Sequence, residues 1–142
     1  MNALKFLSAA AISFAISTPL MADEYKRTGE FVALVASSDS QTRGVEIGSY
    51  VYSGYYSSVS ILNSVHPPLG ASRYQARLYL GIGVGKEPFE FTLGPNIVID
   101  HGVHLGYRAV LIYTIQHAMF GVSGQKSYGF GHDISVIAGY AF

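Results

Sequence analysis

The feature that most constrains this chain is an alternation of apolar and polar side chains with a period of two residues. In the segment 89–99 the apolar face consists of Phe89, Phe91, Leu93, Pro95, Ile97 and Ile99. The other face consists of Glu90, Thr92, Gly94, Asn96 and Val98. The segment Tyr74–Val84 repeats this pattern. Because successive side chains of a strand point to opposite faces, both segments are predicted to be β-strands with one apolar face.

The same reasoning along the whole chain predicts eight strands. They are Phe31–Ala36, Arg43–Tyr52, Tyr55–Asn63, Tyr74–Val84, Phe89–Ile99, Val103–Tyr113, Gln116–Val122 and Ile134–Phe142. An even number allows an antiparallel sheet to close on itself with both chain ends on one side. The fold predicted is therefore all-β, an antiparallel up-and-down β-barrel of about eight strands.

The connections are expected to alternate between long loops at one end and tight turns at the other. The predicted loops are Ser37–Thr42, Ser64–Ser72, Asp100–Gly102 and Ser123–Asp133. The predicted turns are Ser53–Gly54, Gly85–Pro88 and a very tight one near Ile115. Pro95 is the residue that conflicts with this scheme, because proline cannot donate a ladder hydrogen bond. The pair Gly94–Pro95 is consistent with a bulge, a kink, or the edge strand of an open sheet.

The first 22 residues have the pattern of a secretory signal peptide. Lys5 closes a short positive region, 6–16 is apolar, and cleavage is expected after Ala22. An apolar run of this length is too short to cross a bilayer as a helix. The remaining residues, 23–142, are enough for one domain.

Composition after residue 22 narrows the function classes. Without Lys5, eight basic side chains face nine acidic ones, a net charge of −1 with His neutral, and this does not favour nucleic acid as a partner. All 16 Gly and all 11 Tyr lie in this part of the chain, which is typical of β-structure. Cysteine is absent, so a disulfide framework is excluded.

The last nine residues, Ile134–Phe142, place Val136, Ala138, Tyr140 and Phe142 on one face. This ending resembles the closing strand of bacterial outer-membrane β-barrels, in which a terminal Phe and an aromatic residue two positions earlier are read by the barrel-assembly machinery. With the whole-chain alternation, the chain is similar to small eight-stranded outer-membrane proteins. These include the outer-membrane protein X and attachment-invasion types, the transmembrane part of outer-membrane protein A, and the lipid A-modifying barrels.

The resemblance implies that 23–142 is a transmembrane β-barrel in the outer membrane of a Gram-negative cell. It implies that Tyr140 and Phe142 are an assembly signal. The partners implied are outer-membrane lipid, lipopolysaccharide and the barrel-assembly machinery. No motif specific to one of these families accompanies the pattern.

In such a barrel the apolar face meets lipid and the polar face points into a narrow interior. The charged and polar side chains expected there are Glu46, Gln75, Arg77, Glu90, His104 and Arg108. An eight-stranded barrel is just wide enough for side chains to fill it. Because unpaired ions at membrane depth are costly, we predict that these residues pair with one another as a polar plug. The small inner positions Gly81, Gly83, Gly94 and Gly106 leave a pocket as the alternative.

The residues favour a structural or surface-interaction role over catalysis. Acyl-removing barrels use a His-x-Ser-Asn motif, whereas the corresponding region here reads His117-Ala-Met-Phe. A palmitoyl-transfer site could draw on His101 or His132 with Ser127, but their spacing does not require it. No catalytic residue, cofactor or metal site is predicted, since His101 and His104 fall on opposite faces of a strand.

Besides the structural role, the sequence allows a surface-interaction role and two alternative functions. The predicted loops Ser64–Ser72 and Ser123–Asp133 contain aromatic and weakly polar side chains able to meet a surface partner. The alternatives are a lipid A-modifying enzyme and a soluble periplasmic β-barrel whose apolar faces enclose a small apolar ligand.

Overall fold

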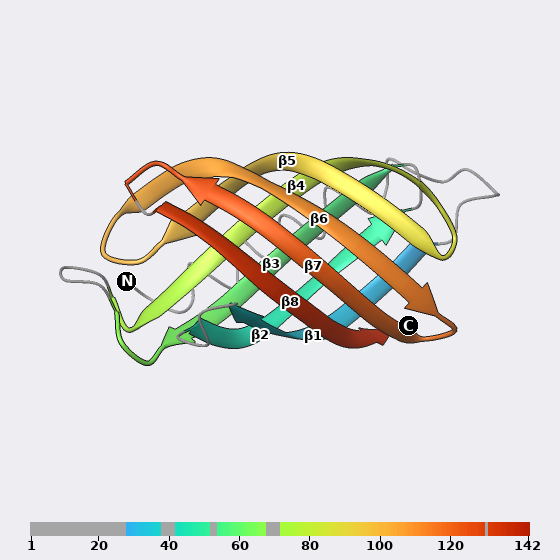
Figure 1. Cartoon of the computed structure of the whole chain (residues 1–142), viewed down its shortest axis with the longest axis horizontal. Coiled ribbons are helices and arrows are strands. Elements are labelled where there is room, and N and C mark those ends of the chain that lie inside the picture. The colour runs from blue at the N-terminus through green and yellow to red at the C-terminus, as the bar shows by residue number, and fades with distance from the viewer. Residues whose placement is uncertain (1–27, 38–41, 52–53, 68–71, 130) are drawn as a thin grey trace.

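The chain forms one closed antiparallel barrel of eight strands in the computed structural model, which describes residues 28–37, 42–51, 54–67, 72–129 and 131–142 (Figure 1). The strands are β1 (Thr28–Ser37), β2 (Thr42–Val51), β3 (Tyr55–Ser64), β4 (Tyr74–Lys86), β5 (Phe89–Ile99), β6 (Val103–Ile115), β7 (Ala118–Ser127) and β8 (Gly131–Ala141). The all-β, eight-stranded antiparallel prediction is confirmed. The expected signal peptide, residues 1–22, lies outside the described residues.

The barrel closes by pairing its first strand with its last. The β1–β8 ladder runs from Phe31 opposite Ala141 to Ser37 opposite Ser135. All other neighbours are consecutive in sequence. Every strand therefore has two partners, and no described strand is an edge.

Pro95 is accommodated inside this closed sheet. It pairs with Tyr107 on β6, whereas on the β4 side the ladder skips the positions of Gly94 and Pro95. The β4–β5 register is the same before and after the gap, because Ile82 pairs with Leu93 and Tyr79 with Asn96. The proline thus costs a local interruption of one ladder and produces neither a register shift nor an edge strand.

The third predicted loop agrees with the structure, and the fourth does not. The expected loop Asp100–Gly102 is present as predicted, but Ser123–Asp133 is mostly strand, because β7 continues to Ser127 and β8 begins at Gly131. The prediction was wrong for a physical reason. The inward side chains of this stretch are polar, so the sequence Ser-Gly-Gln-Lys-Ser resembles a loop although it is part of the wall.

The two ends of the barrel differ in their connections. We call the end of the barrel at which β1, β3, β5 and β7 finish the loop end. The opposite end, at which β2, β4, β6 and β8 finish, is the turn end. The β6–β7 turn is tight enough that Gln116 adopts a positive φ of 55°, a conformation that non-glycine residues seldom take.

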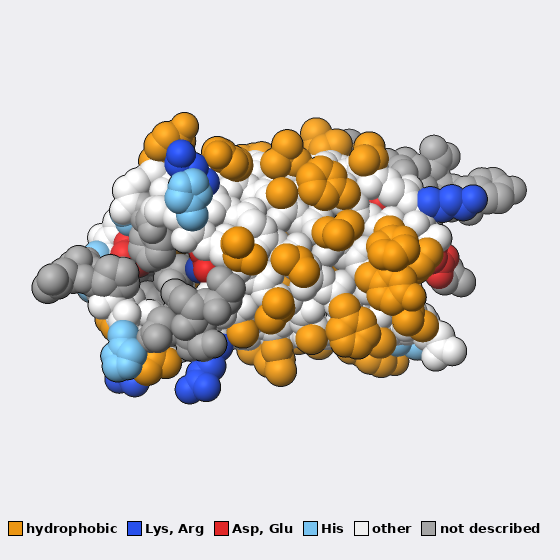
Figure 2. Space-filling model, in the orientation of Figure 1, with side chains coloured by type: hydrophobic (Ala, Val, Ile, Leu, Met, Phe, Trp, Pro, Cys, Tyr) orange, Lys and Arg blue, Asp and Glu red, His pale blue; other side chains and the backbone are white. Residues whose placement is uncertain are grey.

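The outer wall is apolar over most of its height, as the space-filling view shows (Figure 2). Ile82 is 80% exposed and Val84 is 70% exposed, and both alternate with glycines that face inward. Outward Leu, Ile, Val and Phe side chains also occur on β1, β5, β6, β7 and β8. The hydrophobic faces predicted from the sequence are therefore on the outside of the barrel, and the polar faces are on the inside.

Candidate functional site: the barrel interior

The centre of the interior is occupied by a buried ion pair between opposite sides of the barrel. Nη2 of Arg108 on β6 lies 3.0 Å from Oε2 of Glu46 on β2, and both side chains are at most 1% exposed. Tyr56 donates its hydroxyl to Oε1 of Glu46 at 2.7 Å, and Ser60 donates to Oε2 at 2.8 Å. Both carboxylate oxygens are thus hydrogen-bonded, which a buried charge requires.

Arg108 has two further contacts and some unused donor capacity. Its Nη2 also donates to Oγ of Ser123 at 3.1 Å, and its guanidinium carbon lies 5.2 Å from the centre of the Tyr79 ring. That distance is within the range of a cation–π interaction. Nε and Nη1 of Arg108 have no hydrogen-bond partner among the described residues. The guanidinium is held by one ion pair, one hydroxyl and one ring.

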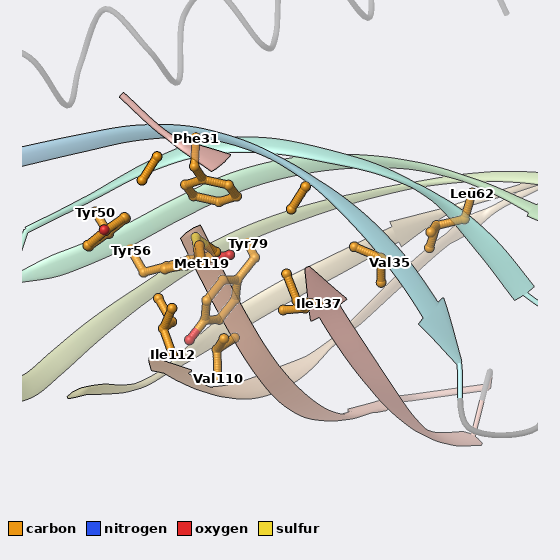
Figure 3. Close-up of a cluster of buried hydrophobic side chains, with 12 residues drawn as sticks. Phe31, Val35, Tyr50, Tyr56, Leu62, Tyr79, Val110, Ile112, Met119 and Ile137 are labelled. Atoms are coloured by element: carbon orange, nitrogen blue, oxygen red, sulfur yellow. The ribbon is translucent and has the colours of Figure 1, made fainter. Parts of the chain in front are cut away.

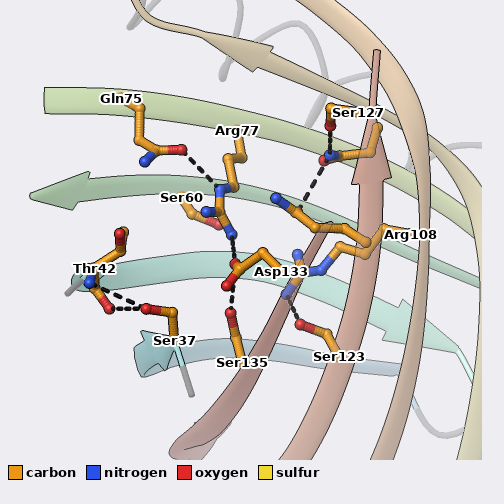
Figure 4. A network of polar contacts seen from close by, with 12 residues as sticks. Ser37, Thr42, Ser60, Gln75, Arg77, Arg108, Ser123, Ser127, Asp133 and Ser135 are labelled. Carbon is orange, nitrogen blue, oxygen red and sulfur yellow. Dashed lines mark hydrogen bonds and ion pairs between the residues drawn. The ribbon is translucent and has the colours of Figure 1, made fainter. Parts of the chain in front are cut away.

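A second charged cluster lies nearer the loop end (Figure 4). Nη1 of Arg77 on β4 lies 2.9 Å from Oδ2 of Asp133 on β8, and its Nε donates to Oε1 of Gln75 at 3.1 Å. Ser135 donates to the same Asp133 oxygen at 3.0 Å. The Asp133 side chain is 19% exposed, so this pair is less completely desolvated than the pair at the centre.

Amide and hydroxyl side chains complete this polar half of the interior. Nδ2 of Asn96 donates to Oε1 of Gln125 at 3.3 Å and to Oγ of Ser127 at 3.4 Å. Ser37 donates its hydroxyl to the carbonyl of Thr42 at 3.1 Å. We call the part of the interior that extends from the Glu46–Arg108 pair to the loop end the polar half.

The other half of the interior, toward the turn end, is packed with rings and aliphatic chains (Figure 3). The ring of Phe31 lies 5.2 Å from that of Tyr56 and 6.1 Å from that of Tyr50, and Tyr56 lies 5.6 Å from Tyr79. These tilted arrangements are typical of favourable aromatic pairs. The rings pack with Val110, Ile112, Met119 and Ile137. We call this region the aromatic half.

Glycines of β4 make room for the large side chains of the aromatic half. A Cβ at Gly81 would collide with the hydroxyl of Tyr79, and one at Gly83 would collide with Oε1 of Glu90. Glu90 is 1% exposed and lies against this glycine surface. The inward glycines expected from the sequence to leave a pocket are therefore covered at these two positions by the side chains of their neighbours.

The six residues predicted to form an interior polar cluster are distributed over three places. Glu46 and Arg108 meet at the centre, and Gln75 meets Arg77 nearer the loop end. Glu90 lies in the aromatic half. His104 lies apart from the others, at the rim of the loop end.

At that rim, His104 connects two loops. Its Nε2 lies 3.0 Å from Oδ1 of Asp100, and its Nδ1 lies 3.3 Å from the carbonyl oxygen of Tyr128. The backbone N–H of Gly102 donates to Oδ1 of Asp100 at 2.9 Å. Burial raises the pKa of Asp100, but the hydrogen bonds from Gly102 and His104 outweigh it and hold the pKa of this carboxyl below its ordinary value.

Three partners in the polar half were not predicted from the sequence. Asp133, Ser123 and Gln125 all face inward, although they fall in the loop expected at 123–133. The signal that could have found them is the alternation of polar inward residues with Val122, Gly124 and Lys126. Extending period two through this polar stretch would have placed Asp133 on the inward face with Arg77.

The two residues expected to form an assembly signal lie on the outside of the turn end. The ring of Tyr140 stacks on His117 at 5.2 Å and meets Phe142 edge-on at 5.3 Å. The N–H of Phe142 donates to the carbonyl of Glu30 at 2.8 Å, which ties it to β1. Nδ1 of His117 lies 2.8 Å from the carbonyl oxygen of Ala141.

His117 and the candidate serines do not form a catalytic arrangement. His117 lies in the turn before β7, while the side chain of Ser123 is six residues further on and binds Arg108. Six residues of strand span about 20 Å. Ser127 accepts from Asn96, and His132 lies on the outer side of β8. A nucleophile and its base must be within hydrogen-bond reach, and neither pairing meets this requirement.

The described ranges contain no cluster of His, Cys, Asp or Glu able to hold a metal ion. They also contain no helix that is both long and apolar enough to cross a membrane.

Comparison with known proteins provides no assignment for this arrangement. No family model, no curated protein and no solved structure matches the chain.

Proposed function

We propose that this protein is a small outer-membrane β-barrel whose interior is filled by its own side chains and whose role is structural or surface-interacting through the loop end. The observation that carries the proposal is the inversion of polarity across the wall. The outward faces of the strands are apolar, and the inward faces carry hydrogen-bonded ion pairs. Lipid around the barrel is the environment in which that arrangement is stable.

The dimensions and the edges of the apolar surface support this proposal. The strands are 10 to 13 residues long, which is sufficient for tilted strands to cross a bilayer. Aromatic residues gather on the outside of the turn end, as expected where a barrel meets the lipid headgroups. They are Phe89, Tyr113, Phe120, Tyr140 and Phe142.

The interior supports a plug rather than a channel. The pairs Arg108–Glu46 and Arg77–Asp133 bridge strands that are not neighbours, and four aromatic rings fill the aromatic half. Because the charged groups pair with one another and the rings fill the remaining space, there is little reason to infer a path for ions. The proposed contribution of the interior is stability.

The two alternatives have less support. A soluble barrel for a small apolar ligand would need a polar outer wall, whereas the outward side chains observed are mostly apolar. A lipid A-modifying enzyme would need a nucleophile beside a base, and His117 is far from Ser123. We therefore propose that the protein is not an enzyme.

The partners follow from the proposed location. Membrane lipid and lipopolysaccharide would surround the wall, and the barrel-assembly machinery would meet the outside of β8 near Tyr140 and Phe142. The short loops offer little area for another protein, although Tyr128 is 72% exposed. A surface partner would have to contact the loop rim and the adjacent outer wall.

The test is membrane fractionation of the full chain combined with gel mobility before and after boiling in detergent. We expect the protein in the outer-membrane fraction and a mobility shift on boiling, because a closed barrel resists detergent until heated. Deletion of the gene should leave the mass of lipid A unchanged. Release in a soluble periplasmic fraction without a shift would refute the membrane proposal, and an altered lipid A mass would refute the non-enzymatic role.

A further inference from the structure

The loop end carries a surplus of exposed basic side chains outside the barrel. Arg43, Arg73 and Lys126 are exposed there and make no ion pair within the described part of the chain. Both described acidic residues of this end have partners, since Asp133 binds Arg77 and Asp100 binds His104. Figure 2 shows Lys, Arg and His side chains at this end, beyond the apolar wall. Among the described residues of the loop rim, the charges without an ion-pair partner are therefore positive.

Three hydrogen-bonding side chains form one row on this rim. Tyr107 on β6 is directly opposite Lys126 on β7, and Lys126 is directly opposite His132 on β8. All three are outward and exposed. Adjacent strands are about 4.8 Å apart, so the row spans roughly 10 Å. A phenol, an ammonium and an imidazole are thus placed within the reach of a single phosphate group.

The wall immediately below this row is apolar, and it is low beneath Tyr107 and Lys126. The next outward positions toward the turn end are Ala109, Gly124 and Ile134, again directly opposite one another. A Cβ added at Gly124 would meet no atom within 4 Å, so the surface there is open. An acyl chain can lie against this strip while its headgroup contacts the row above. Neither feature alone selects a lipid, but together they match a phosphate attached to acyl chains.

We propose that the Tyr107–Lys126–His132 row is a binding site for the phosphate of a membrane lipid, with an acyl chain lying over Gly124. The proposal rests on the membrane location proposed above. Lys126 supplies the charge, and the Tyr107 hydroxyl and a His132 ring N–H supply hydrogen bonds.

Arg43 provides a matched control on the other side of the barrel. It is also exposed, outward and at the loop end, and its row continues through Asn63 to Tyr74. Below this row lie Val45, Ile61 and Ala76, so a valine lies below Arg43 where Gly124 lies below Lys126. If general positive charge attracted the lipid, Arg43 and Lys126 would contribute equally. If the row with its low apolar strip is the site, Lys126 dominates.

The test uses two lipids that differ only in phosphate. The purified full chain in detergent is mixed with dipalmitoyl phosphatidic acid or with dipalmitoylglycerol, and bound lipid is counted by native mass spectrometry. We expect the wild type to bind phosphatidic acid at least about tenfold more tightly. The double variant Lys126→Ala/His132→Ala should lose that preference, whereas Arg43→Ala should change the affinity less than about threefold. Inorganic phosphate at millimolar concentration should not displace the lipid.

Three results would overturn this proposal. Equal binding of the two lipids would show that phosphate is not recognised. Equal losses in Arg43→Ala and in the double variant would show unspecific attraction. Displacement of the lipid by inorganic phosphate would indicate a site for free anions. Each variant is first tested for the mobility shift on boiling, and absence of a shift in the wild type would instead refute the barrel-in-membrane proposal.

Discussion

The two halves of the interior are built from the same eight strands but are held together by different interactions. In the polar half, buried charges are matched one to one, as in Arg108 with Glu46. In the aromatic half, the rings and aliphatic side chains around Phe31 carry no charge and are held by packing. A charged group that loses its partner keeps its full desolvation cost, whereas a ring that is truncated loses only its own contacts. The polar half should therefore respond to mutation in pairs, and the aromatic half residue by residue.

The largest expected effect comes from breaking the central pair on one side only. Glu46→Gln should lower the free energy of unfolding by about 3–5 kcal/mol, because it leaves Arg108 charged and buried. Urea titration of the protein in lipid vesicles, followed by the mobility shift, measures this. Glu30→Gln is the matched control, since Glu30 is exposed on the outside. The double variant Glu46→Gln/Arg108→Met should be more stable than Glu46→Gln, and a further loss would contradict charge matching.

A slightly smaller loss is expected in the aromatic half. Phe31→Ala should cost about 3 kcal/mol through lost burial and the cavity left beside Tyr50 and Tyr56. The neighbouring outward substitution Val32→Ala serves as the control and should cost less than about 1 kcal/mol. The same urea titration reports both values. Equal costs for the two would mean that the rings are loosely packed.

The Arg77–Asp133 ion pair tests whether the degree of desolvation sets the free-energy cost of breaking a buried pair. Arg77→Met leaves Asp133 without its cation, but Asp133 is partly exposed, so water can replace the arginine. We expect a loss of about 1–2 kcal/mol, below that of Glu46→Gln. If Arg77→Met loses as much free energy of unfolding as Glu46→Gln, a position near the loop end does not reduce the desolvation cost.

The smallest effect is a local pH dependence at the loop rim. The pKa of Asp100 is lower in the folded state than its ordinary value, so its stabilising contribution is complete above that ordinary value and is lost as the pH falls through the folded pKa. Below about pH 4 the Gly102 N–H should lose its charged acceptor. The NMR shift of the Gly102 amide proton should move in this range. In Asp100→Asn it should stay constant, and a titration persisting in that variant would exclude Asp100 as its source.

Much of the wall could be predicted from the residues because strand geometry is local. The alternation in 74–84, 89–99 and 103–113 assigned each side chain to a face, and Arg77, Glu90 and Arg108 are buried as their positions in that alternation require. The alternation is not recognisable at 123–133, because the inward residues there are polar and small and the contrast between the two faces disappears. Asp133 was consequently placed in a loop, and the partner of Arg77 was not identified.

The sequence by itself determined that the chain forms strands, which face of each is apolar, and that Glu46, Arg77, Glu90 and Arg108 lie on the inward face. Only the tertiary structure decided which charges meet. Glu46 and Arg108 are 62 residues apart and Arg77 and Asp133 are 56 apart, and no local pattern relates them. Their contacts depend on how far each strand is offset against the next and on the pairing of β1 with β8. Those offsets accumulate around the barrel, so the meeting of side chains across its interior is a property of the closed sheet as a whole.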